Sequence, residues 1–80
     1  NTLIVVHRDR VGIAAHITSC LSQRNVNIAY MKLFRENKGD RAYSILEFDN
    51  DVPDDIKEKI SEKADVERVV LIRVREGKHD

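Results

Sequence analysis

Cysteine is almost absent from this chain of 80 residues, which contains one. A single thiol excludes a disulfide within the chain, and it excludes an iron–sulfur cluster or an all-cysteine metal site held by this chain alone. The sequence also lacks internal repeats, low-complexity stretches and linkers. The sequence therefore predicts one compact unit without a disulfide framework.

Neither sign of charge is in excess, because 14 Lys and Arg balance 14 Asp and Glu. A nucleic-acid-binding module usually carries a basic excess, so we expect no nucleic-acid partner. No apolar run approaches the roughly 18 residues of a membrane span, and no signal peptide is recognisable. We therefore expect a cytoplasmic setting and no membrane partner.

What is present suits a folded domain: 41% of residues are hydrophobic and 35% are charged. Eighty residues leave room for one core, so residues 1–80 are expected to form a single domain. The sequence starts at Asn1 and passes directly into an apolar run. This start favours a domain taken from a longer polypeptide.

Hydrophobic periodicity divides the first half of the chain into a strand, a helix and a second strand. The first strand is expected over Leu3–His7, which is apolar on both parities and is therefore read as covered on both faces. A helix follows, with its apolar stripe on Ile13, Ile17, Cys20 and Leu21. Asn25 suits the left-handed residue that ends a helix. The second strand is expected over Val26–Arg35, with a bulge near Ala29.

The second half predicts a hairpin, a helix and a last strand. The hairpin turn contains Gly39, which is free to adopt positive φ, and leads into a strand over Arg41–Asp49. Pro53 suits the first turn of a helix, with Asp54 and Asp55 near the positive end of its dipole. The buried stripe of this helix is expected on Ile56, Ile60 and Ala64. The last strand is expected over Val66–Val74.

The order β-α-β-β-α-β predicts an α+β fold, the ferredoxin-like sandwich: a four-stranded antiparallel sheet with two helices on one face. The other face, which includes Tyr43 and Ile45, is left apolar and uncovered. We expect it to be a contact surface, used for self-association or for docking onto the rest of a larger enzyme.

Three functions of this fold can be checked against the residues. An RNA reader needs stacking aromatic residues on both middle strands, and the first strand has none. A metal carrier needs two close cysteines, whereas Cys20 stands alone on an apolar stripe, so no metal is expected. An acylphosphatase-like enzyme needs an arginine in the first turn, as at Arg8 or Arg10, and an asparagine on the second strand, as at Asn27. That match is partial and leaves an enzyme as one alternative.

A fourth possibility comes from a resemblance. The stretch VHRDRVGI over residues 6–13, with Asn27 fifteen residues after Gly12, resembles the ACT domain family of amino-acid-sensing regulatory modules. The family commonly has proline where Val11 stands and glycine where Asn25 stands. The resemblance implies a non-catalytic regulatory domain. It also implies a homodimer paired through the second strand, with the ligand at a seam along Met31 and Leu33.

The middle of the chain, residues 31–42 and 45–49, is similar to the ACT domain of iron–sulfur-dependent L-serine dehydratases, in their β chain or β-like region. D-3-phosphoglycerate dehydrogenase ends in a similar module that senses serine, and His7 matches a histidine of its first turn. The resemblance implies a parent enzyme that converts L-serine to pyruvate and ammonia. It implies a 4Fe–4S cluster in that parent and no cofactor in this domain.

The residues themselves also suit a small amino acid. The N-terminus of the first helix suits a carboxylate, and Gly12 permits close approach to the backbone. Asn27 offers a donor and an acceptor, and Asp9 can receive an ammonium group. With His7 and Arg10, these residues form the expected ligand-binding site, provided that the first turn and the start of the second strand meet.

Each of these residues also has a purely structural interpretation. Asp9 can cap the helix, Gly12 can serve helix packing, and His7 or Asn27 can satisfy the end of a strand. A structural docking or dimerisation domain is therefore the alternative function.

Overall fold

The computed structural model describes residues 1–10, 12–36 and 40–73. It contains the six predicted elements in the predicted order: β1 (Thr2–Arg8), α1 (Ile13–Gln23), β2 (Ile28–Arg35), β3 (Arg41–Phe48), α2 (Ile56–Ser61) and β4 (Val66–Ile72). The predictions for Gly39 and for the end of the last strand at Val74 lie outside the described residues.

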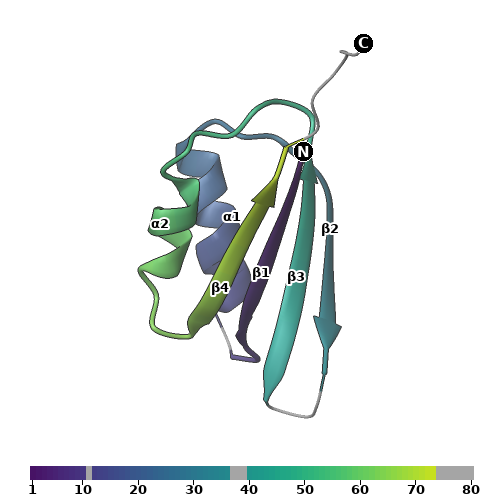
Figure 1. Cartoon of the computed structure of the whole chain (residues 1–80), viewed down its shortest axis with the longest axis vertical. Helices are drawn as coiled ribbons and strands as arrows, with labels where there is room; N and C mark the ends of the chain where they lie inside the picture. The colour runs from purple at the N-terminus through teal and green to yellow at the C-terminus, as the bar shows by residue number, and fades with distance from the viewer. Residues whose placement is uncertain (11, 37–39, 74–80) are drawn as a thin grey trace.

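The four strands form one antiparallel sheet in the order β2-β3-β1-β4, and both helices lie on the same side of it (Figure 1). The ferredoxin-like fold is thereby confirmed. β1 is central, while β2 and β4 are the edge strands. In the part of the chain that the structure describes, neither helix has the length and apolar character needed to cross a bilayer.

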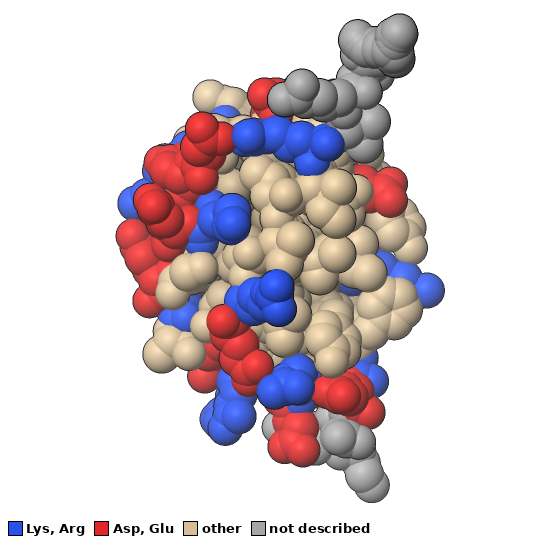
Figure 2. Space-filling view, viewed as in Figure 1, with Lys and Arg blue, Asp and Glu red and all other residues tan. Residues whose placement is uncertain are grey.

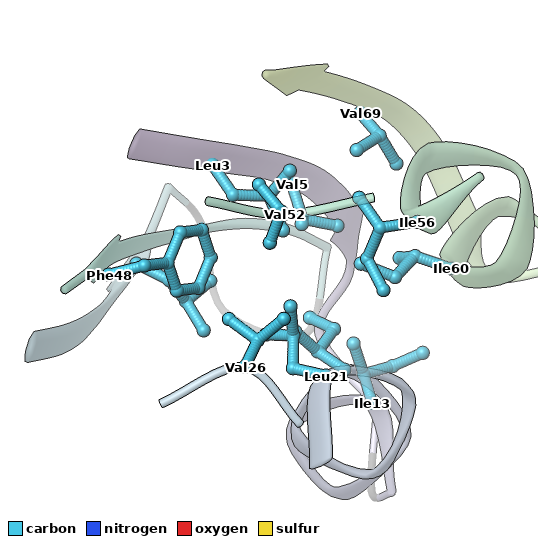
Figure 3. Packing of buried hydrophobic residues seen from close by; sticks show 12 residues of the cluster. Leu3, Val5, Ile13, Leu21, Val26, Phe48, Val52, Ile56, Ile60 and Val69 are labelled. Carbon is cyan, nitrogen blue, oxygen red and sulfur yellow. The ribbon is translucent and has the colours of Figure 1, made fainter. Parts of the chain in front are cut away.

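The core lies between the sheet and the helices, as Figure 3 shows. Alternate residues of each strand point into it, and the two helices supply its other wall. Its buried apolar side chains are Leu3, Val5, Ile13, Ile17, Leu21, Val26, Leu46, Phe48, Val52, Ile56, Ile60 and Val69. Burial of this apolar surface is the main force that holds the helices on the sheet.

The two irregularities predicted around the start of β2 are confirmed. Asn25 has φ 59°, the left-handed conformation that ends α1. The register with β3 shifts between Ile28 and Tyr30, which places the bulge at Ala29. β2 begins at Ile28 rather than at Val26, because the N–H of Val26 donates to the carbonyl of Leu21 and so closes the helix end.

The predicted start and inner stripe of the second helix need correction. α2 begins at Ile56, after a turn in which the N–H of Ile56 donates to the carbonyl of Pro53. Ala64 is exposed, because tighter bonds between residues three apart end the helix at Ser61 and turn the chain toward β4. Asp55 gives no side-chain cap; it bonds to Arg24 instead, which lowers the pKa of the Asp55 carboxyl.

The side of the sheet away from the helices is uncovered within this chain; we call it the open face. Ile4 and Val6 are half-buried on it, whereas Leu3, Val5 and His7 of the same strand are buried against the helices. The prediction that the first strand is covered on both faces is therefore wrong for a single copy. Figure 2 shows the open face, with uncharged surface at its centre and charged side chains around it.

Candidate functional site

Asp9 lies in the turn after β1 and is held on two sides. Its N–H donates to the carbonyl of Asp40 at 2.8 Å, and Arg35 Nε donates to its carboxylate at 2.7 Å. The helix begins after Gly12 without a side-chain cap, so the interpretation of Asp9 as the helix cap is wrong. A carboxylate can accept about four hydrogen bonds, so Asp9 keeps capacity for an ammonium group beside Arg35.

His7 is 1% exposed, and both ring nitrogens have partners inside the protein. Nδ1 lies 2.8 Å from the carbonyl oxygen of Arg8, and Nε2 lies 2.8 Å from Ser44 Oγ. In this arrangement the ring offers no free atom to a ligand. These bonds hold the ring at the end of β1, where the turn with Asp9 starts. Arg10, in the same turn, is exposed to solvent.

Gly12 has φ 93°, a conformation that residues with a side chain rarely adopt. A Cβ atom built at this position meets nothing within 4 Å. The helix-packing interpretation of Gly12 is therefore not supported, and the backbone conformation explains the glycine. The open space in front of it leaves the backbone accessible.

Replacing Gly12 by alanine is expected to lower the free energy of unfolding by about 1 kcal/mol, because the left-handed conformation strains a residue with a Cβ atom. Gly12→Asn is the matched control, since asparagine tolerates this conformation better. Urea unfolding of both variants checks the prediction. Equal losses would show that something other than the φ angle requires glycine here.

Asn27 lies just before β2 and is tied to the segment that follows β3. Its side-chain nitrogen Nδ2 donates to Asp49 Oδ2 at 2.9 Å, and its backbone N–H donates to Asn50 Oδ1 at 3.3 Å. No described residue donates a hydrogen bond to its carbonyl oxygen Oδ1. Asn27 therefore keeps one free acceptor for a ligand.

The structure does not bring the first turn and the start of β2 together within one chain. Ile28 pairs with Phe48 at one end of β3, whereas Arg8 pairs with Arg41 at the other. Seven residue steps separate these ends, which is about 23 Å of strand. α1 and the turns at its two ends connect them across this length, so the expected convergence of Asp9 with Asn27 is wrong for a single copy.

The same separation argues against the acylphosphatase-like enzyme. An acylphosphatase-like centre would need Arg10 or Arg8 beside Asn27, and these residues lie at opposite ends of the sheet. One copy of the chain therefore does not form that catalytic pair.

Two shallow depressions mark the two ends of the sheet. At the Asn27 end, one of about 470 Å³ is lined by Thr18, Ser22, Asn25, Val26, Asn27 and Ile28. At the other end, one of about 400 Å³ is lined by Arg8, Glu36, Asp40, Arg41 and Glu67. The first is a groove between α1 and the start of β2, and it has Asn27 on its wall.

Sequence reasoning missed the partners that hold the predicted site residues, namely Arg35, Ser44, Asp49 and Asn50. For Ser44 a signal existed, because it is the polar member of an otherwise apolar inward series on β3. The other three lie on β2 or follow β3, and only the strand pairing brings them to their partners.

His16 and Cys20 form a separate contact on α1. His16 Nε2 lies 3.0 Å from the carbonyl oxygen of Ile60 and 3.8 Å from Cys20 Sγ. Burial raises the pKa of the Cys20 thiol above its ordinary value. Across residues 1–10, 12–36 and 40–73, no group of three histidine, cysteine or acidic side chains is placed to hold a metal ion.

Two known enzymes match this chain over most of its length. The chain is 31% identical over 71 residues to D-3-phosphoglycerate dehydrogenase of Methanocaldococcus jannaschii, and 27% identical over 70 residues to the probable L-serine dehydratase β chain of Bacillus subtilis. These matches cover 89% and 88% of this chain, but they span only 14% and 32% of the two relatives.

The fold is shared with the ACT domain of prephenate dehydrogenase from Bacillus anthracis. That structure matches with a TM-score of 0.56 and 22% identity, over 78% of this chain and 86% of the other. The sequence model of the ACT domain matches residues 1–65. By its sequence and its strand order, the chain belongs to the ACT domain family.

Proposed function

We propose that this ACT domain is a regulatory module that binds a small amino acid, L-serine or a close analogue, at a seam between two copies. The observation that supports it is the placement of Asn27 and the Asp9 turn at opposite ends of an edge strand. Neither end forms a complete site for an amino acid. One end carries the amide of Asn27, and the other carries the carboxylate of Asp9 and the start of α1.

Pairing through β2 would bring these parts together. β2 has β3 on one side only, so its outer backbone groups are available to another strand. If a second copy adds its own β2 antiparallel to the first, the two copies run in opposite directions. The Asn27 end of one copy then lies beside the Asp9 end of the other. Met31 and Leu33 lie along this seam, where Leu33 is 36% exposed.

The chemistry of the composite site follows from its groups. The free carbonyl of Asn27 and the carboxylate of Asp9 can accept the ligand's ammonium group. The start of α1 has no acidic side chain in its first turn, so its positive dipole end can face the ligand's carboxylate. Gly12 leaves room there. Thr18 and Ser22 line the groove beside Asn27 and suit the hydroxyl of serine.

Calorimetric titration of the 80-residue chain tests this proposal. L-Serine, glycine and the other amino acids are titrated at up to millimolar concentration, with the oligomeric state measured in parallel. We expect one small amino acid to bind, and Asn27→Ala to weaken its binding at least about tenfold, because a hydrogen bond to a charged group is lost.

Gln23→Ala is the matched control, since this exposed amide on α1 is not among the residues that line the groove. It should leave the affinity unchanged. If a dimeric chain binds no amino acid, the proposal is overturned, and a structural docking or dimerisation domain is the function that remains.

We further propose that the parent is an L-serine dehydratase, supported by the relative of that name and by the similarity of residues 31–42. The parent would convert L-serine to pyruvate and ammonia, and the amino acid bound here would favour one arrangement of its subunits. A 4Fe–4S cluster of such an enzyme would be held by cysteines elsewhere, because this chain has only Cys20. The cluster and the cytoplasmic setting stay predictions.

A further inference from the structure

The open face combines an apolar centre with exposed charged side chains. The centre consists of Ile4, Val6, Tyr43, Ile45, Val70 and Ile72. Ile72 is 47% exposed and the others are half-buried. A continuous apolar patch of this kind on a small domain marks a contact surface.

Two charges on this face, Glu47 of β3 and Arg68 of β4, identify what can cover it. A third, Lys32 of β2, lies over the ring of Phe34, 4.8 Å from its centre. Glu47 and Arg68 are exposed, and neither forms an ion pair with any residue in the described ranges. A partner that covers the face must therefore offer a positive group to Glu47 and a negative group to Arg68.

The register places these two charges symmetrically. Glu47 lies opposite Thr2, and Arg68 lies opposite Val6. Thr2 and Val6 stand two residues before and two residues after Ile4, and β3 and β4 lie on opposite sides of β1. Ile4 is thus midway between the two charges, about 8 Å from each.

We propose that the open face binds the open face of a second copy, around a two-fold axis that passes over Ile4. Such an axis places Glu47 of one copy opposite Arg68 of the other. Because the contact is symmetric, the same ion pair forms a second time with the copies exchanged. The two Ile4 side chains meet at the centre. The chain itself thereby supplies the partner that the face requires.

This arrangement agrees with how sheets pack. The axis lies oblique to the strands, so the strands of the two sheets cross steeply, as in the orthogonal class of sheet packing. It uses side chains of β1, β3 and β4 and leaves the outer backbone of β2 free. The open-face contact is therefore independent of the edge pairing proposed for the ligand site, and the two contacts together would assemble four copies.

Charge reversal tests this contact. Glu47→Arg and Arg68→Glu are made singly and together in the 80-residue chain, and sedimentation equilibrium gives the mass and the dissociation constant. Each single reversal places like charges together twice, so we expect the dissociation constant to rise at least about tenfold. The double variant restores both ion pairs with their signs exchanged, and its dissociation constant should return to the starting value.

Glu58→Arg and Lys57→Glu on α2 are the matched controls, because these exposed charges lie on the helix side of the sheet. They should leave association unchanged, and circular dichroism verifies that every variant is folded. Association that is unaffected by the single reversals, or that stays weak in the double variant, overturns the proposal. A chain that binds no amino acid but shows this pattern would overturn the ligand site alone.

Discussion

Replacing Leu46 by alanine is expected to lower the free energy of unfolding by about 3 kcal/mol. Leu46 is fully buried on the helix side of β3, within the main apolar cluster. The substitution removes apolar contacts and leaves a cavity that the packed surroundings fill only in part. A domain of this size has a small margin of stability, so urea unfolding followed by circular dichroism should show a large shift of the midpoint.

Ile45 provides the control, because it is the neighbour of Leu46 on the same strand and points to the open face. Ile45→Ala should cost about 1 kcal/mol in a single copy, since its side chain is only half-buried. The comparison is made in the Glu47→Arg background, which removes the proposed pairing of the open faces. Equal losses at the two positions would contradict the assignment of the core to one side of the sheet.

Removing the hydroxyl of Ser44 is expected to lower the free energy of unfolding by about 2 kcal/mol, although the change in volume is small. The carbonyl of Arg8 only accepts hydrogen bonds, so Nδ1 of His7 carries the proton that bonds to it. In the tautomer with the ring proton on Nδ1, Nε2 is an acceptor, and the hydroxyl of Ser44 donates to it. Ser44→Ala leaves this buried acceptor without a donor.

A double-mutant cycle separates the hydrogen bond from the packing of the ring. His7→Leu alone leaves the Ser44 hydroxyl unpaired, whereas His7→Leu with Ser44→Ala removes both polar groups together. The double variant should therefore lose less stability than the sum of the two single variants, by about 1 kcal/mol. Strict additivity in urea unfolding would show that the contact between His7 and Ser44 contributes nothing.

The fold was predictable because its signals are local. The stripe of Ile13 and Ile17 and the out-of-phase Ile28 depend only on spacing, and they correctly predicted α1 and the bulge in β2. The inner stripe of α2 failed at Ala64 for a physical reason. The helix is short, and its end is set by turn bonds that hydrophobic spacing does not encode.

The site was less predictable, because its partners are distant in sequence. The pattern singled out Asp9 and Asn27, but it did not show that they lie at opposite ends of β3. It also could not assign Arg35 to Asp9, or Asp49 to Asn27, because strand pairing decides which residues become neighbours. The surroundings of His7 depend in the same way on the alignment of β1 with β3.

The central position of β1 has a consequence for how the molecule forms. The first strand of the chain pairs with β3 and β4, and its Thr2 lies opposite both Glu47 and Ile72. During synthesis β1 must therefore wait until most of the chain has left the ribosome, while α1 and the hairpin of β2 and β3 can form from nearby residues. Closing such long loops is slow, so we expect folding in milliseconds or longer, with β4 completing the sheet at a late step.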